Sequence, residues 1–261
     1  MKDLKISLIG SGRVATQLAT AFYAAHVQIQ QVLSRNIHHA ARLAQQVNAI
    51  AIDDVTQLAL VDILIIAVSD AEIIHVAEQL RQLNYQGCVV HTSGSTDITS
   101  LADKNLRAGV FYPLQTFSFE HQVNWSNVPI FLEAVQPQDI QVLEYLAQLL
   151  TAKIYHYSSQ QRLALHLAAV FACNFSNYCY DIAQQILQSQ HVDTGLLQPL
   201  IMETASKLEF FSAVHNQTGP AKRHDHNILT LHQQMLADSP KWQNIYQVMS
   251  DGIQRRHTWT A

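Results

Sequence analysis

The feature that most limits the fold is a glycine-rich turn near the N-terminus. The stretch Gly10-Ser11-Gly12-Arg13-Val14-Ala15 follows a short apolar run and leads into a segment with helical periodicity. In such a strand–turn–helix unit the first glycine permits the tight turn, the second lets the backbone approach a pyrophosphate, and the small last residue allows close packing of helix on strand. Free N–H groups at the helix start attract the anion. We therefore predict a dinucleotide-binding βαβ unit in which residues 10–15 contact the cofactor.

Short apolar runs alternate with amphipathic segments from residue 4 to about residue 157. Strands that are apolar on both faces and separated by helices are typical of a doubly wound parallel sheet, so we predict an α/β, Rossmann-like domain over residues 1–157. The predicted strands are Lys5–Ile9, Ile29–Leu33, Ala49–Ile52, Ile63–Val68, Cys88–His91, Ala108–Phe111, Ile130–Glu133 and Lys153–Tyr157. The predicted helices are Val14–Ala25, His38–Val47, Ala71–Leu83 and Asp139–Leu150.

Strand patterns end at Ser158-Ser159, a pair suited to begin a helix. Four helical stretches follow, at about 159–190, 195–215, 225–237 and 240–255, and glycine or proline separates them. We therefore predict a second, all-helical domain over residues 158–261.

Charge and cysteine content exclude several classes of protein. Charged residues make up 14% of the chain, the net charge is −4, and no basic run exceeds Arg255-Arg256, so a nucleic-acid-binding surface is not expected. The longest apolar run, 58–68, contains Asp62 and is too short to span a bilayer, and no signal-peptide pattern follows Met1. Three cysteines without a CxxC pair fit reduced thiols. We expect a cytoplasmic protein without a membrane partner.

The end of the second predicted strand indicates which nucleotide is bound. NAD-specific folds usually place an acidic residue there for the ribose 2′-hydroxyl, but this chain has Ser34-Arg35-Asn36. A hydroxyl and an arginine suit a 2′-phosphate, and His38 or His39 would add to the pocket. We therefore predict NADP (NADPH) as cofactor, held by Ser34 and Arg35. The alternative is a solvated arginine in a loop.

Later strands should end at the same crevice, because ligands of such sheets bind at the carboxyl ends of the strands. Val68-Ser69-Asp70 follows the fourth predicted strand, and Ser93-Gly94 follows the fifth. We expect these five residues to contact the cofactor. Small residues at 93 and 94 would let the backbone approach its nicotinamide end, whereas Asp70 could instead be the N-cap of the next helix.

Several segments together resemble a bacterial family that pairs a Rossmann-like oxidoreductase domain with a helical domain of unassigned function. The resemblance covers nearly the whole chain and rests on GSGRVA at 10–15, AVSD at 67–70, HTSGS at 91–95, YPLQTF at 112–117 and TGPAKRHD at 218–225. More distantly the chain is similar to pyrroline-5-carboxylate reductase, deazaflavin-dependent NADP reductases and 3-hydroxyacid dehydrogenases. The resemblance implies nucleotide binding and, more loosely, hydride transfer.

Candidate catalytic residues lie on the first helix of the second domain. Arg162, His166, Val170 and Asn174 are four residues apart and so would share one helical face. Related dehydrogenases and reductases often place a catalytic lysine and an asparagine on this helix; here His166 stands where the lysine is expected, and Asn174 follows. A histidine can donate a proton near neutral pH. The alternative is that both are polar residues between packed helices.

The substrate is expected to carry an anionic group. Thr218-Gly219-Pro220 precedes a predicted helix whose free N–H groups would attract an anion, and Arg223 can grip a carboxylate with two hydrogen bonds. The resemblance supports this, because a comparable turn in pyrroline-5-carboxylate reductases helps bind the substrate carboxylate, commonly within a dimer. We assign Arg223 to catalysis as well as to binding. Asp225 would orient Arg223 or cap the helix, and Tyr112 and Gln115 would line the substrate pocket.

Two further classes of site are not supported by residue spacing. The histidines at 38, 39, 224, 226 and 232 lack zinc-site spacing, so we expect no metal, and the chain has no GxSxG sequence for serine hydrolysis. Residues 163–171 are apolar nearly all round the predicted helix, which predicts a homodimer formed through the helical domain.

The sequence therefore predicts an NADP-dependent oxidoreductase acting on a small anionic carbonyl or imine compound. One alternative is a nucleotide-binding sensor or regulatory protein that has lost the catalytic lysine. A second is an interaction module that mainly dimerises, which would leave the glycine turn unexplained.

Overall fold

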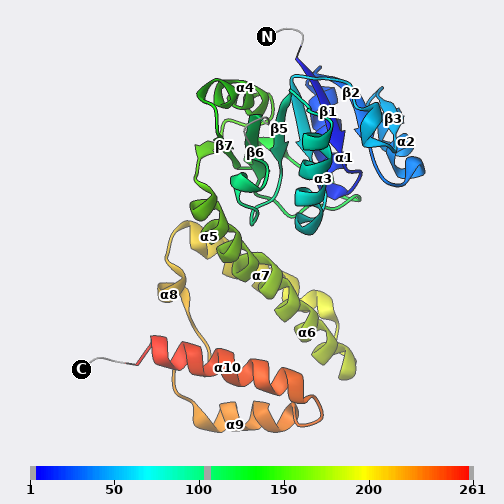
Figure 1. Ribbon diagram of the computed structural model, residues 1–261. Helices are drawn as coiled ribbons and strands as arrows, with labels where there is room; N and C mark the ends of the chain where they lie inside the picture. The colour runs from blue at the N-terminus through cyan, green and yellow to red at the C-terminus, as the bar shows by residue number, and fades with distance from the viewer. Residues whose placement is uncertain (1–3, 103–106, 259–261) are drawn as a thin grey trace. The chain divides into compact units, whose positions relative to one another are not determined.

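The chain folds into two compact units, Met1–Val170 and Phe171–Ala261 (Figure 1). The structure, a computed structural model, describes residues 4–102 and 107–258. Among these described residues, no helix combines the length and the apolar character that crossing a membrane requires.

The first unit is built on an eight-stranded sheet with the strand order β3-β2-β1-β4-β5-β6-β7-β8. The order from β3 to β6 is that of a Rossmann fold, which confirms the predicted fold class. The strands are β1 (Lys5–Ile9), β2 (Gln28–Leu33), β3 (Ile50–Ile52), β4 (Ile63–Ile66), β5 (Cys88–His91), β6 (Arg107–Pro113), β7 (Ile130–Ala134) and β8 (Ile154–His156).

One pair of strands departs from the expected parallel arrangement. β6 and β7 are antiparallel, and Pro113 pairs with Ile130. A parallel pair needs a crossover connection, usually a helix, whereas only a loop with one short 3₁₀ turn, Trp125–Asn127, joins these strands. The sheet is therefore mostly parallel.

Helices cover both faces of this sheet (Figure 1). Adjacent residues of a strand point to opposite faces, so Ile63 and Ile65 pack in one apolar core and Leu64 and Ile66 in the other. This explains why the strands are apolar without alternation. The first core includes residues of α1 (Arg13–Ala24), α2 (Ile37–Gln46) and α4 (Pro137–Gln148), and the second includes residues of α3 (Asp70–Gln82).

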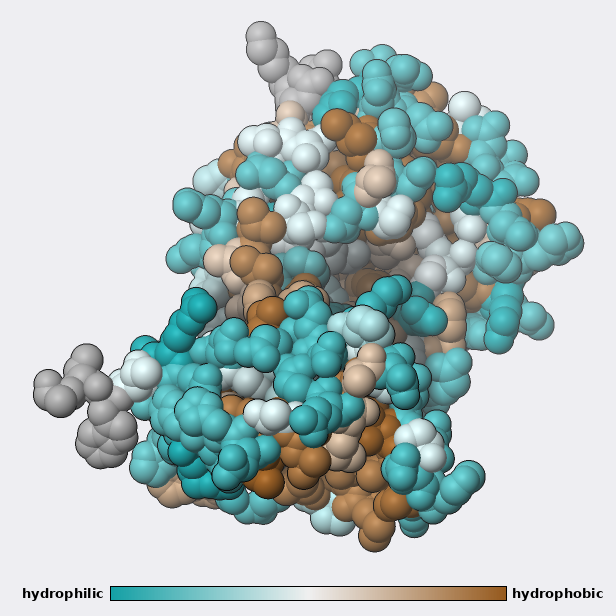
Figure 2. All heavy atoms as spheres, turned by 90° about the horizontal axis from the view of Figure 1, so that it is seen from below, coloured by the Kyte–Doolittle hydropathy of each residue, from teal (hydrophilic) through white to brown (hydrophobic). Residues whose placement is uncertain are grey.

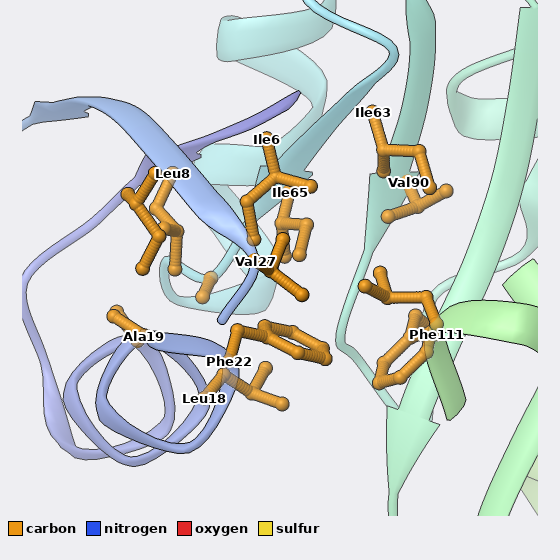
Figure 3. Packing of buried hydrophobic residues seen from close by; sticks show 14 of the residues in the cluster. Ile6, Leu8, Leu18, Ala19, Phe22, Val27, Ile63, Ile65, Val90 and Phe111 are labelled. Carbon is orange, nitrogen blue, oxygen red and sulfur yellow. The ribbon is translucent and has the colours of Figure 1, made fainter. Parts of the chain in front are cut away.

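The packing of α1 fixes the glycine-rich turn in place. Leu18, Ala19 and Phe22 of α1 are fully buried against the sheet (Figure 3). The ring of Phe22 meets that of Phe111 on β6 edge-on, with centroids 5.8 Å apart. The helix that begins at the turn is thus anchored by its apolar face, and its first residues remain at the carboxyl edge of the sheet.

The first predicted helix of the C-terminal part is divided. Ser158 begins α5 (Ser159–Ala169) with a capping box that it forms with Gln161. A π-helical turn, Val170–Phe175, then separates α5 from α6 (Ser176–Ser189). The division between the two units falls at this π-helical turn, so α5 belongs to the first unit.

The second unit is helical over its described residues. After α6 come a 3₁₀ turn at Thr194–Leu197, α7 (Gln198–Ser206), a 3₁₀ turn at Lys207–Glu209, α8 (Ala213–Asn216), α9 (His226–Met235) and α10 (Pro240–Arg256). The single helix predicted at 195–215 is therefore a series of short ones.

Candidate active site

A cavity of about 1,120 Å³ opens at the carboxyl ends of the first unit's parallel strands. It brings together fifteen residues that the sequence assigned to cofactor, substrate or catalysis: Gly10, Ser11, Gly12, Arg13, Val14, Ser34, Arg35, Val68, Ser69, Asp70, Ser93, Gly94, Tyr112, Gln115 and His166. Segments that are far apart in the sequence therefore form one site.

The glycine turn has the geometry that a pyrophosphate needs. Gly10 has φ +120°, and a Cβ there would clash with the carbonyl oxygen of Ala67, so only glycine fits. Gly12 lines the cavity, and a Cβ there would meet no protein atom within 4 Å. Gly12 is also the N-cap of α1 and offers no side chain to its first N–H groups. Space and donors are thus left for an anion. Ala15 is fully buried and contributes packing.

Ser34 and Arg35 lie at one end of this cavity, with contacts that the sequence did not predict. The hydroxyl of Ser11 donates to that of Ser34 at 3.0 Å. The guanidinium of Arg35 forms an ion pair with Glu72 on α3, with Nη1 and Oε2 3.1 Å apart. Asp53, Asp54 and His75 also line the cavity, whereas His38 and His39 do not.

The acidic residues near Arg35 were missed because they come from other elements. The prediction considered only the residues that follow β2, where no carboxylate stands. Asp53 and Asp54 follow β3, the neighbour of β2, and Glu72 lies in the first turn of α3. The pair Asp53-Asp54 directly after a strand was the available sequence signal.

Tyr112, His166 and Gly94 converge at another part of the cavity. The hydroxyl of Tyr112 lies 3.3 Å from Nδ1 of His166. A Cβ at Gly94 would stand 2.7 Å from that nitrogen and 2.7 Å from the Tyr112 ring, so the three residues leave no space between them. Burial raises the pKa of Tyr112, which keeps its hydroxyl protonated. A hydroxyl and an imidazole in contact can pass a proton to a bound molecule.

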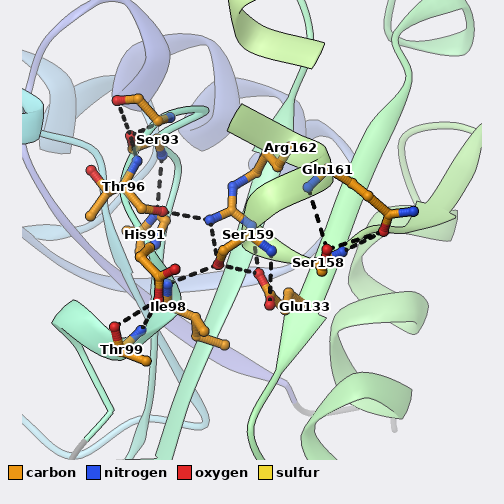
Figure 4. Close-up of polar contacts among 12 residues, drawn as sticks. His91, Ser93, Thr96, Ile98, Thr99, Glu133, Ser158, Ser159, Gln161 and Arg162 are labelled. Atoms are coloured by element: carbon orange, nitrogen blue, oxygen red, sulfur yellow. Dashed lines mark hydrogen bonds and ion pairs between the residues drawn. The ribbon is translucent and has the colours of Figure 1, made fainter. Parts of the chain in front are cut away.

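A buried arginine on α5 links this helix to neighbouring segments of the first unit (Figure 4). Arg162 is only 1% exposed and forms an ion pair with Glu133 of β7, with Nη1 and Oε2 2.6 Å apart. Its other terminal nitrogen donates to the carbonyl of Thr96 and to the hydroxyl of Ser159. α5 is thus tied both to β7 and to the loop after β5. Because His166 lies one turn further along α5, these bonds position it.

The loop after β5 is ordered by its own polar groups. His91 is fully buried, and its Nδ1 accepts the N–H of Ser93 at 3.2 Å. Burial and, secondarily, the charge of Arg162 lower the pKa of His91 to about 3, so the imidazole stays neutral. The hydroxyl of Ser93 accepts the N–H groups of Ser95 and Thr96 at 3.1 and 2.9 Å.

Asp70 is not the N-cap of α3, which was the alternative to a cofactor contact. Ser69 is the N-cap of α3, and Asp70 is the first residue of the helix. The Asp70 carboxylate accepts the hydroxyl of Ser95, which links α3 to the loop after β5. Asp70 therefore connects two walls of the cavity.

The remaining predicted residues belong to the second unit. Asn174 is exposed in the π-helical turn, which interrupts the four-residue spacing from His166 on which its prediction rested. Thr218, Gly219 and Arg223 lie in a turn, and Arg223 is exposed. Because α9 begins only at His226 and Asp225 caps it, the free N–H groups of that helix are not those of Thr218 and Gly219.

No group of three or more metal-binding side chains occurs among the residues that the structure describes.

Two family models match the chain. Residues 1–99 match the model of shikimate / quinate 5-dehydrogenase, and residues 128–253 match a domain of unknown function, DUF2520. No curated protein matches the chain.

Solved structures resemble the chain over nearly its full length. A Bacteroides fragilis protein described as a "putative NADP oxidoreductase" is 37% identical, with a TM-score of 0.90, and the match covers 97% of this chain and 99% of that one. A pyrroline-5-carboxylate reductase from Coxiella burnetii is 17% identical, with a TM-score of 0.59 and coverage of 97% and 98%. A reductive aminase from Aspergillus terreus, in complex with NADPH and ethyl-5-oxohexanoate, is 16% identical, with a TM-score of 0.69 and coverage of 97% and 93%. The last two share the fold.

Proposed function

Because the chain belongs to the family of Rossmann-like oxidoreductases that carry a DUF2520 domain, we propose that it transfers a hydride between NADP and a small anionic carbonyl or imine compound. The observation that carries the proposal is the single cavity that holds both the glycine turn and the Tyr112–His166 pair. A cofactor site and a proton-transferring pair in one cavity suit hydride transfer, which requires both.

The cofactor is proposed to be NADP, which supplies the hydride when it is bound in its reduced form. Residues 10–14 would hold the pyrophosphate, and Ser34 and Arg35 the 2′-phosphate. Val68, Ser69, Asp70, Ser93 and Gly94 would contact the remainder of the cofactor. The description of the Bacteroides fragilis relative also names NADP, which supports this choice.

His166 and Tyr112 are assigned to proton transfer. The hydroxyl of Tyr112 keeps its proton because burial raises its pKa, and Nδ1 of His166 lies within reach of that hydroxyl. Together they would supply a proton to the oxygen or nitrogen of the reduced substrate. The Arg162–Glu133 pair would keep α5 at the distance that this contact needs.

Contacts to the rest of the substrate are proposed from the chemistry of the residues and from the family resemblance. Gln115 lines the cavity and offers an amide. Thr218, Gly219 and Arg223 are the candidates for its anionic group, since the exposed guanidinium of Arg223 has no ion pair with a described residue. Asn174 is retained as a further candidate.

The activity is tested by following the absorbance of NADPH with a panel of keto acids, imines and flavin analogues. Wild type should oxidise NADPH with at least one keto acid or imine, and His166→Ala should lose most of this activity while binding NADPH unchanged. Tight NADPH binding without turnover on any compound would instead identify a nucleotide sensor.

We also propose that the protein is a homodimer formed through its helical unit and that it functions in the cytoplasm, where its three unpaired cysteines would stay reduced. Between residues 171 and 258 only Ala221 and Ser250 are buried, so this unit has almost no core of its own. Apolar side chains open to the surface are visible as brown patches in Figure 2. A second copy of the chain would cover these side chains, which include Phe171, Leu196, Leu200, Met202, Phe210 and Met235.

Light scattering at micromolar concentration tests the dimer. Wild type should have twice the monomer mass, and Leu200→Glu combined with Phe210→Glu should be monomeric, because buried carboxylates would oppose association. Leu60→Glu is the control, since Leu60 is 64% exposed, as Leu200 is at 63%, but lies in the first unit. A monomeric wild type contradicts the proposal.

A further inference from the structure

We propose that Glu72 sets how strongly the cavity selects NADPH over NADH, by competing with the 2′-phosphate for Arg35. The inference rests on the proposed cofactor site and assigns a specificity-determining role to a cavity residue that is not among the predicted cofactor contacts. Arg35 is the cation that the sequence assigns to the 2′-phosphate, and its guanidinium is already paired with Glu72.

The two partners of this ion pair differ in how firmly they are held. Glu72 lies in the first turn of α3, which is anchored by the fully buried Ile73 and Ala77, and its own carboxylate-bearing side chain is 35% exposed. The Arg35 side chain is 85% exposed at the end of β2. The carboxylate therefore stays at the cavity wall, while the longer arginine side chain can turn toward a ligand.

The charges around Arg35 strengthen the competition. Asp53 and Asp54 line the same cavity, and hydrogen bonds from Thr56 lower the pKa of Asp54, so this carboxylate stays charged. His75, one turn after Glu72 on α3, also lines the cavity. An entering 2′-phosphate brings close to two negative charges to this surface and competes with Glu72 for Arg35.

NADH does not meet this obstacle. It carries a hydroxyl in place of the 2′-phosphate, and a hydroxyl can donate to a carboxylate. The charge of Glu72 therefore weakens NADPH binding and leaves NADH binding nearly unchanged. Removing that charge should raise the preference for NADPH.

The test is titration calorimetry of the full-length protein with NADPH and with NADH. Glu72→Gln keeps the size of the side chain and removes its charge. In this variant residue 72 no longer competes for Arg35 or repels the phosphate, so NADPH should bind about 3- to 10-fold more tightly. The affinity for NADH should change less than about twofold.

Glu78→Gln is the matched control, because Glu78 is an exposed glutamate of the same helix that does not line the cavity. It removes the same charge, so an effect of net charge alone would appear in both variants. The affinities for 2′,5′-ADP and 5′-AMP are measured as well, because these fragments contain only the adenosine end of the cofactor, with and without the 2′-phosphate. The effect of Glu72→Gln should appear with 2′,5′-ADP alone.

The Arg35→Ala background tests whether Glu72 acts through Arg35. Without the guanidinium there is no cation to compete for, so most of the gain from Glu72→Gln should disappear in the double variant. A gain of equal size in both backgrounds would overturn the competition for Arg35.

Failure of the inference and failure of the proposed function give different results. If wild type prefers NADPH and loses this preference in Arg35→Ala, but Glu72→Gln behaves like Glu78→Gln or binds NADPH more weakly, the role of Glu72 is wrong. If wild type binds neither nucleotide, the proposed cofactor site itself is wrong.

Discussion

The hydroxyl of Tyr112 and Nδ1 of His166 lie 3.3 Å apart, although the two residues are 54 positions apart in the chain. Tyr112 comes from β6 and His166 from α5, and Gly94 fills the remaining space beside them. From the more distant similarity to dehydrogenases and reductases we expected a lysine where His166 stands, and a histidine has a shorter reach. Because His166 contacts the hydroxyl of Tyr112, a proton can pass between the imidazole and the substrate through that hydroxyl.

Tyr112→Phe removes this hydroxyl and keeps the ring. Turnover of NADPH with an active compound should fall by about 100-fold, the lower end of what a positioned proton donor contributes. The affinity for NADPH should stay within about twofold, since the change adds no bulk to the cavity. Steady-state kinetics and calorimetry measure the two quantities.

Tyr155→Phe is the control for this substitution. Tyr155 is half-exposed, stacks on Phe131 and does not line the cavity. Full activity in Tyr112→Phe would remove the tyrosine from the proton route.

The two glycines of the turn should fail in different ways. Gly10→Ala forces a positive φ on alanine and drives its Cβ into the carbonyl of Ala67, so we expect a loss of about 2 kcal/mol or more in the free energy of unfolding. In Gly12→Ala the new methyl group meets no protein atom within 4 Å, but alanine is a poorer N-cap than glycine, so stability should fall by no more than about 1 kcal/mol.

The affinity for NADPH should also be reduced in Gly12→Ala, although this variant remains folded. The new methyl group of Gly12→Ala would occupy the space of the pyrophosphate and weaken NADPH binding by at least about tenfold. Urea unfolding and calorimetry on the same samples give both values. Unchanged NADPH affinity in a stable Gly12→Ala variant would place the pyrophosphate elsewhere.

His91 should make the folded state sensitive to acid. Its pKa is lowered from 6.5 to about 3 in the folded protein, so below pH 6.5 the unfolded chain binds a proton that the folded chain does not. The free energy of unfolding is therefore unaffected by His91 above pH 6.5. Below that pH it falls by up to about 1.4 kcal/mol per pH unit.

His91→Asn tests this pH dependence, because the amide oxygen can still accept the N–H of Ser93 and does not titrate. Urea unfolding between about pH 7 and about pH 5 should show a shallower loss of stability in the variant than in wild type. If the free energy of unfolding fell equally steeply with pH in wild type and variant, the pKa of His91 would not be lowered by folding.

Much of the structure of the first unit could be predicted from local sequence alone. The roles of Gly10 and Gly12 follow from their own backbone, and apolar runs such as Ile63–Ile66 indicate a strand buried on both faces wherever the neighbours lie. Ser34 and Arg35 lie in the cavity because the end of β2 must lie beside the end of β1.

Contacts between distant segments were not predictable from the sequence. The Arg35–Glu72 and Arg162–Glu133 pairs each join residues from different elements, and no spacing rule connects them. The burial of Arg162 depends on a carboxylate 29 positions earlier in the chain. The π-helical turn that contains Asn174 also has no simple sequence signal, so a regular helix was expected there.

The central claim is that this cavity transfers a hydride, and transfer of an isotope label tests it most directly. NADPH carrying deuterium at C4 of the nicotinamide, in separate preparations for each face of the ring, is incubated with the keto acid and imine panel, and the products are analysed by mass spectrometry. We predict deuterium in at least one product from one of the two preparations, with much less in His166→Ala at equal NADPH occupancy. NADPH that binds with the label retained in both preparations, across the whole panel, would contradict the account.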